Sequence, residues 1–142
     1  MQKHKIIFIG ESLMLAMCID IALKNFKKIF VITSDKSIKK KFRKKVLFTT
    51  IENIKKIKPD YLFSVLNKKI LPKTCINKVK KIALNFHDGP LPKYAGMFSS
   101  SWSIANNEKM HGVCWHKIEK KIDSGDILEE KKFKIQNNDT AY

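Results

Sequence analysis

The chain has 142 residues, of which 44% are hydrophobic, and its formal net charge is +16. That length supports one hydrophobic core, so the sequence predicts a single domain over residues 1–142. No apolar run could span a bilayer, and the N-terminus lacks the long apolar segment and the cleavage site of a signal peptide. We therefore expect a cytoplasmic protein without a membrane partner.

Lysine supplies nearly all of the positive charge, because Arg43 is the only arginine. A basic chain of this kind can bind nucleic acid or an anionic membrane surface. It can equally have a Lys-rich composition whose charges are simply solvated, and the densest basic run, residues 36–45, fits either interpretation. Surfaces that read bases use arginine forks and stacked aromatic rings more often than lysines. The scarcity of arginine therefore favours a solvated surface over a nucleic-acid partner.

The three cysteines, Cys18, Cys75 and Cys114, lie far apart in the sequence. Neither a Cys-x-x-Cys nor a His-x-His spacing occurs, and these are the spacings expected of metal ligands. The pattern predicts free thiols, with no disulfide framework and no metal site.

Strand and helix patterns alternate along the first 86 residues. Short apolar or β-branched runs predict strands, and the stretches between them predict helices. In chain order we expect strands over residues 5–10, 28–34, 46–50, 60–67 and 81–86, and helices over 13–26, within 36–45, over 51–57 and from about residue 72. Ser12 is the predicted N-cap of the first helix. This alternation predicts an α/β fold with a mainly parallel sheet and helices on both faces.

The pattern changes after Gly96. Residues 97–108 predict a helix capped within its serines, and residues 111–118 and 126–135 predict two half-exposed strands joined as a hairpin. An α/β domain usually finishes with a helix that covers the remaining sheet face, and the sequence predicts none here. We therefore expect a truncated domain with an incomplete C-terminal part.

Asn85 and His87 stand at the end of the fifth predicted strand. Residues two apart in a strand project to the same side, and ligand sites in parallel sheets lie beyond the carboxyl ends of the strands. An amide together with a protonated imidazole can hold an oxyanion there. The alternative is that Asn85 caps a turn and His87 is a hydrogen-bonded loop histidine.

The loop that follows, residues 88–96, contains two glycines and two prolines. Glycine permits unusual backbone angles and proline restricts them, so the loop should be rigid. A purely structural turn would explain the composition equally well. A cis peptide bond between Leu91 and Pro92 is one way to form it.

Further candidates lie downstream, where Asp123 follows His116 by seven residues within an Asp-Ser-Gly turn. A carboxylate near His87 would keep that imidazole protonated and could accept or relay a proton. The alternative is that Asp123 only shapes its own turn. His111, which precedes Gly112, is predicted to lie at the surface.

Four segments, Asn85–His87, LPKYAG (91–96), HGVCWH (111–116) and IDSGDI (122–127), together resemble the formyltransferase family that uses 10-formyltetrahydrofolate. Its members include glycinamide ribonucleotide formyltransferase, methionyl-tRNA formyltransferase and sugar N-formyltransferases. Within the family, the segments look most like the formyltransferase domains joined to nonribosomal peptide or polyketide synthases. The resemblance covers essentially the whole chain and implies a Rossmann-like formyltransferase fold.

The resemblance also implies an activity, the transfer of a formyl group from 10-formyltetrahydrofolate to a primary amine of a small molecule, amino sugar or carrier-bound amino acid. Asn85 and His87 would stabilise negative charge on the formyl oxygen, while Asp123 keeps His87 charged and helps to move the proton of the amine. The reaction requires no metal. The alternatives are a formyltetrahydrofolate hydrolase and a catalytically weak basic binding module.

A folate pocket lined by strand ends and by the loop before Asp123 is part of the same expectation. Its predicted lining residues are Phe63, Val65, Leu66, His116, Ser124 and Gly125. The segment 88–90 reads Asp-Gly-Pro, whereas the family commonly has Pro-Ser-Leu after the histidine. This departure leaves the identity of the amine open.

Overall fold

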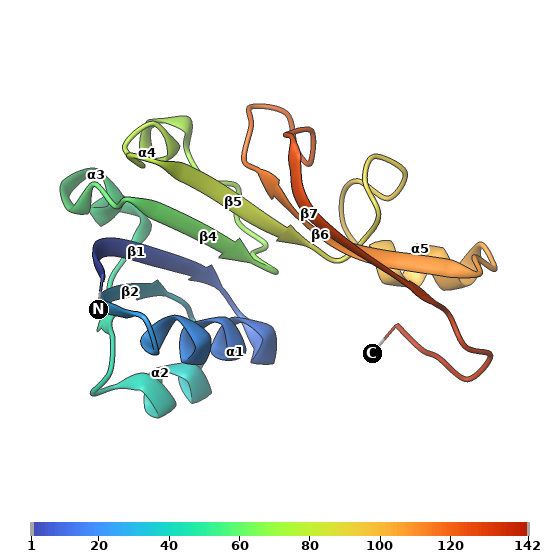
Figure 1. Cartoon of the computed structure of the whole chain (residues 1–142), viewed down its shortest axis with the longest axis horizontal. Coiled ribbons are helices and arrows are strands. Elements are labelled where there is room, and N and C mark those ends of the chain that lie inside the picture. Colours follow the sequence, from blue (N-terminus) through green and yellow to red (C-terminus); the bar gives the residue numbers. More distant parts are fainter. Residues whose placement is uncertain (1, 142) are drawn as a thin grey trace. The chain divides into compact units, whose positions relative to one another are not determined.

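The structure is a computed structural model that describes residues 2–141 (Figure 1). The chain forms two compact units, Met1–Leu84 and Asn85–Tyr142, which divide within strand β5 (Ile82–His87). Among the described residues, no helix is both long enough and apolar enough to cross a membrane. That residues 1–142 act as one catalytic domain stays a prediction.

The N-terminal unit alternates strands and helices, as the sequence predicts. Its strands are β1 (Gln2–Gly10), β2 (Phe26–Ile32), β3 (Leu47–Phe48), β4 (Tyr61–Val65) and the beginning of β5. Its helices are α1 (Ser12–Leu23), α2 (Lys36–Phe42), the 3-10 helix η1 (Ile51–Asn53), α3 (Ile54–Ile57) and α4 (Lys73–Ile76).

These strands are hydrogen-bonded in the order β3-β2-β1-β4-β5. The pairs β1–β2, β1–β4 and β2–β3 are parallel, with Phe8 of β1 opposite Val31 on one side and Phe63 on the other. Figure 1 shows α1 and α2 on one side of β1 and β2, and α3 and α4 on the other. Covered on both faces, the centre of β1 is almost fully buried, which explains its continuous apolar run.

A close approach of two backbones ends β1 at Gly10. Its φ is 144°, and a Cβ at this position would lie 1.8 Å from the carbonyl oxygen of Val65. The turn leaves Ser12 as the first residue of α1 with φ 85°, whereas Glu11 occupies the N-cap position. The predicted Ser12 cap is wrong, because an N-cap residue needs extended backbone; the Ser12 hydroxyl is buried and has no partner among the described residues.

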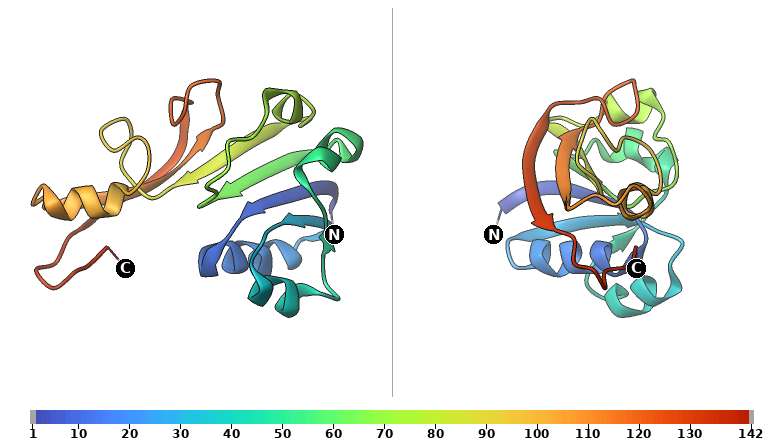
Figure 2. Two further views of the ribbon diagram at one scale, coloured as in Figure 1. Left: turned by 180° about the vertical axis from the view of Figure 1, so that it is seen from behind. Right: turned by 90° about the vertical axis from the view of Figure 1, so that its right-hand side faces the viewer.

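The C-terminal unit contains the end of β5, α5 (Ser99–Ala105), β6 (Met110–Lys117) and β7 (Ile127–Lys134). Its strand order is β5-β6-β7, and β6 and β7 form the predicted antiparallel hairpin. Figure 2 shows α5 beside the beginning of β6, where Ser103 contacts His111. The predicted serine cap of α5 is wrong, because Phe98 is the N-cap residue, with a left-handed backbone (φ 63°).

We expect Gly10→Ala to lower the free energy of unfolding by about 3 kcal/mol, because the added Cβ overlaps a backbone oxygen that cannot move away. Gly96→Ala is the matched control, since Gly96 also has positive φ (100°) but nothing lies within 4 Å of the new Cβ. That control should cost only the backbone strain, about 1–2 kcal/mol. Urea unfolding measures both, and equal losses would contradict the steric explanation.

Candidate active site

The end of β5 places Asn85 and His87 on one side of the strand, facing His116 of β6. The Asn85 amide nitrogen lies 3.1 Å from His116 Nε2, and the rings of His87 and His116 are 6.3 Å apart between centroids. Only 5% of His87 and 2% of His116 is exposed. The strand alternation therefore brings an amide and two buried imidazoles together.

Asp123 reaches this cluster from the loop between β6 and β7. Its Oδ1 lies 3.3 Å from His116 Nε2, and its Oδ2 lies 3.6 Å from His87 Nδ1. The backbone N–H of Gly96 donates to Oδ2 at 2.8 Å. Asp123 has φ 50°, a left-handed conformation that aspartate adopts more readily than most residues. The carboxylate is thus aimed at two histidines across the unit.

The cluster shifts the ionisation of its own members. Burial raises the pKa of Asp123. The hydrogen bonds with His116 and the Gly96 N–H and the nearby His87 lower it by more than burial raises it, so the pKa ends below its ordinary value. Burial lowers the pKa of His116, and the hydrogen bonds with Asp123 and the Lys117 carbonyl more than offset this, so that this pKa ends above its ordinary value. Asp123 and His116 therefore form an ion pair.

Protonation of His116 determines how Asn85 is oriented. The Nδ1–H of His116 donates to the carbonyl of Lys117 at 2.9 Å, and its Nε2–H donates to Asp123. A protonated Nε2 has no lone pair to accept from an amide N–H. A half-turn of the Asn85 amide places Oδ1 beside Nε2 instead, which frees the NH₂ group to donate to a ligand.

Both ring nitrogens of His87 face oxygen acceptors. Nε2–H donates to the carbonyl of Tyr94 at 2.6 Å, and Nδ1 faces the carboxylate of Asp123. Because a carbonyl oxygen can only accept, Nε2 carries the hydrogen that fixes the ring to Tyr94 and turns Nδ1 towards Asp123. Tyr94 belongs to the proline-containing loop, in which the Leu91–Pro92 peptide bond is cis.

The apolar residues predicted to line a folate pocket, Phe63, Val65 and Leu66, lie at the carboxyl end of β4 in the N-terminal unit. Phe63 stacks on Phe8 with ring centroids 5.2 Å apart. Val65 is fully buried, and Leu66 leaves the strand with a left-handed backbone (φ 46°). Their part in folate binding stays a prediction.

Ser124 and Gly125, also predicted to bind folate, have local roles in the loop after β6. The hydroxyl of Ser124 donates to the carbonyl of Lys121 at 2.9 Å. A Cβ at Gly125 would lie 2.0 Å from the carbonyl oxygen of Lys117, so only glycine lets the loop approach the strand this closely. Their contact with folate stays a prediction as well.

The prediction that His111 lies at the surface is wrong. Only 7% of the residue is exposed, because α5 packs over the beginning of β6 and Ser103 hydrogen-bonds to the ring. The contact of the Gly96 N–H with Asp123 was also not predicted. In the sequence, only the glycine at position 96 pointed to this contact. The backbone there has a φ of 100°, a conformation that favours glycine.

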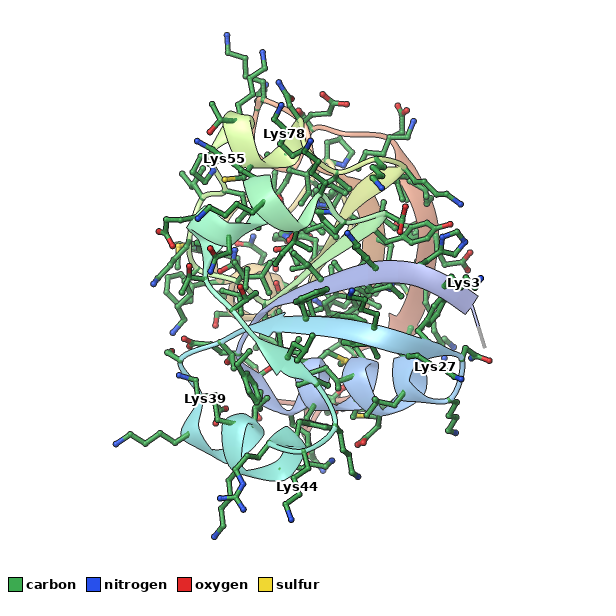
Figure 3. All side chains as sticks on the ribbon, turned by 90° about the vertical axis from the view of Figure 1, so that its left-hand side faces the viewer. Lys3, Lys27, Lys39, Lys44, Lys55 and Lys78 are labelled. Atoms are coloured by element: carbon green, nitrogen blue, oxygen red, sulfur yellow. The ribbon has the colours of Figure 1, made fainter. Side chains whose placement is uncertain are left out.

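The net charge is divided unevenly between the two units. Residues 1–84 contain 21 Lys and Arg against 5 Asp and Glu, which gives +16, whereas residues 85–142 contain 8 of each and are neutral. Figure 3 shows labelled lysines pointing outward from different elements of the N-terminal unit, namely Lys3, Lys27, Lys39, Lys44, Lys55 and Lys78. Such a spread is typical of a solvated surface.

The ion pair makes stability depend on pH in a defined window. The pKa of Asp123 is lowered on folding, so its contribution is present above about pH 4 and is lost as the pH falls through the folded-state pKa. The pKa of His116 is raised, so its contribution is present below about pH 6.5 and is lost as the pH rises through the folded-state pKa. We therefore expect the difference in free energy of unfolding between wild type and Asp123→Asn to be largest between about pH 4 and 6.5, with wild type the more stable.

Urea titrations at several pH values measure this difference. Asp126→Asn is the control. Asp126 lies in the same loop as Asp123 and pairs with Lys117 at the end of β6, but its side chain is 79% exposed. Its effect should be small at every pH. A difference between wild type and Asp123→Asn that does not change with pH would contradict the ion pair.

Known proteins resemble this chain in sequence. A family model described as Formyl transferase matches residues 27–142. The bifunctional polymyxin resistance protein ArnA of Wigglesworthia glossinidia brevipalpis is 40% identical over 91 residues, which are 64% of this chain and 14% of that protein. Methionyl-tRNA formyltransferase of Clostridium tetani is 37% identical over 91 residues, 64% of this chain and 29% of that protein. The chain spans less than a third of these relatives.

Solved structures match nearly the whole chain. The N-formyltransferase from Helicobacter canadensis, in complex with folinic acid and dTDP-3-aminofucose, has a TM-score of 0.85 and 30% identity, covering 97% of this chain and 55% of that one. The sugar 3N-formyl transferase WlaRD, in the presence of dTDP and 5-N-formyl-THF, has a TM-score of 0.80 and 28% identity, covering 99% and 55%. These matches confirm the predicted Rossmann-like α/β fold. Since the family model covers most of its length, the chain belongs to the formyl transferase family.

Proposed function

We propose that this chain carries the catalytic site of an N-formyltransferase, which moves a formyl group from 10-formyltetrahydrofolate to a primary amine. The observation that carries the proposal is the meeting of Asn85, His87 and Asp123 within one unit, next to a buried second histidine, His116. This set combines donors for a developing negative charge with a carboxylate that can handle a proton. Membership of the formyl transferase family supports the same reaction.

Asn85 and His87 stabilise the charge that builds on the formyl oxygen when the amine attacks the formyl carbon. The ion pair of His116 with Asp123 turns the Asn85 amide so that its NH₂ group is available to that oxygen. His87 is held by the Tyr94 carbonyl and faces Asp123, so the position of its ring is fixed. Because little water reaches these side chains, each charge acts strongly on the reacting oxygen.

Asp123 assists the transfer of the proton. As the bond from the amine nitrogen to the formyl carbon forms and the bond from that carbon to N10 of the folate breaks, one proton must pass from the amine to N10. The lowered pKa makes Asp123 a poor final acceptor, so it relays the proton and does not keep it. Its lasting contribution is to hold His116 in its charged form and to orient the ring of His87 that it faces.

We propose an amino sugar attached to a nucleotide as the amine substrate. The N-formyltransferase of Helicobacter canadensis was solved with dTDP-3-aminofucose, and WlaRD was solved with dTDP. An amine bound to a carrier protein is the alternative acceptor. For the folate we assign contacts to the six predicted residues, Phe63, Val65, Leu66, His116, Ser124 and Gly125.

The purified chain, mixed with 10-formyltetrahydrofolate and a panel of amines that includes dTDP-amino sugars, should release tetrahydrofolate together with a formylated amine. We expect Asp123→Asn to lower kcat at least about 100-fold, because it removes both the proton relay and the charge that supports the histidines. The exposed neighbour variant Asp126→Asn should retain wild-type rates.

Equal rates for wild type and Asp123→Asn would remove this mechanism. Release of formate without any formylated amine would instead indicate a hydrolase. Binding of generic DNA that weakens steeply with salt, in a chain that shows no turnover, would indicate a basic binding module.

The role of Asn85 is tested separately. We expect Asn85→Ala to lower kcat by about 10²–10³, because one donor to the formyl oxygen is lost, while the KM for 10-formyltetrahydrofolate changes little. Asn85→Asp keeps the size of the side chain but lacks the NH₂ group, so it should be impaired as well. Steady-state kinetics on both variants measure these changes in kcat and KM. An Asn85→Asp variant with wild-type kcat would contradict the donor role of Asn85.

A further inference from the structure

Asp88 follows His87 directly and accepts hydrogen bonds from three side chains. Its carbonyl accepts from His111 Nε2 at 2.9 Å and from the Ser99 hydroxyl at 2.9 Å. Its carboxylate accepts from Ser99 at 2.9 Å and from Ser100 at 3.2 Å. The residue next to the catalytic imidazole is thus anchored to both α5 and β6.

His111 is a buried histidine that the proposed reaction does not use. Its ring packs edge-on against Tyr94 and Phe133, with centroids 6.4 Å and 5.7 Å apart. Its Nδ1 lies 2.8 Å from the hydroxyl of Ser103. Since a carbonyl oxygen can only accept, Nε2 must carry the hydrogen that is donated to Asp88. Both nitrogens are therefore committed, and the ring orientation is fixed.

The space around Gly89 shows how tightly this anchor is coupled to His87. A Cβ at Gly89 would lie 2.6 Å from the Cβ of Ser99 and 3.2 Å from His87 Nε2. The backbone of residues 88–89 therefore runs between α5 and the imidazole with no room for another atom. A shift of this backbone must change the position of the His87 ring.

We propose that His111 is a positioning residue for His87. By holding the Asp88 carbonyl, it fixes the direction in which β5 ends and keeps the His87 ring between the Tyr94 carbonyl and Asp123. The inference rests on the proposed function for its effect on rate. The same proposal explains the Asp-Gly segment after His87. Asp88 accepts hydrogen bonds from the Ser99 and Ser100 hydroxyls of α5, and Gly89 has no side chain that would collide with this helix.

His111→Phe tests the proposal, because it keeps an aromatic ring in place and removes the donor. We expect kcat to fall about 10- to 100-fold, as displacement of a catalytic group by about 1 Å does, with the KM for 10-formyltetrahydrofolate nearly unchanged. His111→Gln can still donate from the Nε2 position and should restore most of the rate. Phe133→Leu changes the packing on the His111 ring without touching the hydrogen bond, so its kcat should stay at the wild-type value.

The ¹⁵N resonances of the His87 ring provide a readout that does not depend on turnover. They should shift in His111→Phe and stay near wild type in His111→Gln. Unchanged His87 resonances in His111→Phe, or a Gln variant as impaired as the Phe variant, would overturn the positioning role. If wild type transfers no formyl group, the proposed function fails, and the resonances still decide the role of His111. If His111→Phe does not fold, Ser103→Ala, which removes only the partner of Nδ1, takes its place, and the same resonances are judged.

Discussion

The contact of one carboxylate with two imidazoles is the interaction on which the site depends. The side chains of Asp123, His87 and His116 are 9%, 5% and 3% exposed, and the negative charge of Asp123 depends on its contacts with the two rings. A lone charge in this position would be strongly penalised by desolvation, whereas Asp123 and His116 compensate each other as an ion pair. The orientation of Asn85 follows from the protonation of His116. The charges of Asp123 and His116 and the orientation of Asn85 are therefore set by one electrostatic arrangement.

Backbone geometry serves the same arrangement. Asp123 stands in a left-handed conformation within its loop, Gly125 brings that loop against Lys117, and the Gly96 N–H holds the carboxylate from the opposite loop. Such conformations cost free energy and persist where the surrounding structure determines them. The two loops are thus held in the conformations that aim the Asp123 carboxylate at the two rings.

Sequence periodicity could predict the parallel α/β pattern and the hairpin, because each depends on local alternation of apolar residues. The pairing of Asn85 with His87 followed from strand geometry alone, but the approach of Asp123 came only from the family resemblance, since spacing along the chain does not fix distance in space. The Ser12 cap failed because the backbone conformation at Ser12, not its residue type, decides whether it caps. The burial of His111 depends on how α5 packs, which no local pattern contains.

The excess positive charge and the candidate site residues around Asp123 belong to different parts of the sequence. The residues that meet around Asp123 belong to a stretch, 85–142, with no net charge, whereas the excess of +16 lies in residues 1–84. Lysines that point into solvent are screened within about 10 Å at moderate ionic strength, so they contribute little to the ionisation of buried groups. The charge states of His116 and Asp123 are instead determined by contacts of 3–4 Å, where the effective dielectric is low. The ionisation of Asp123 and His116 therefore depends on these short contacts and little on the Lys-rich composition of the surface.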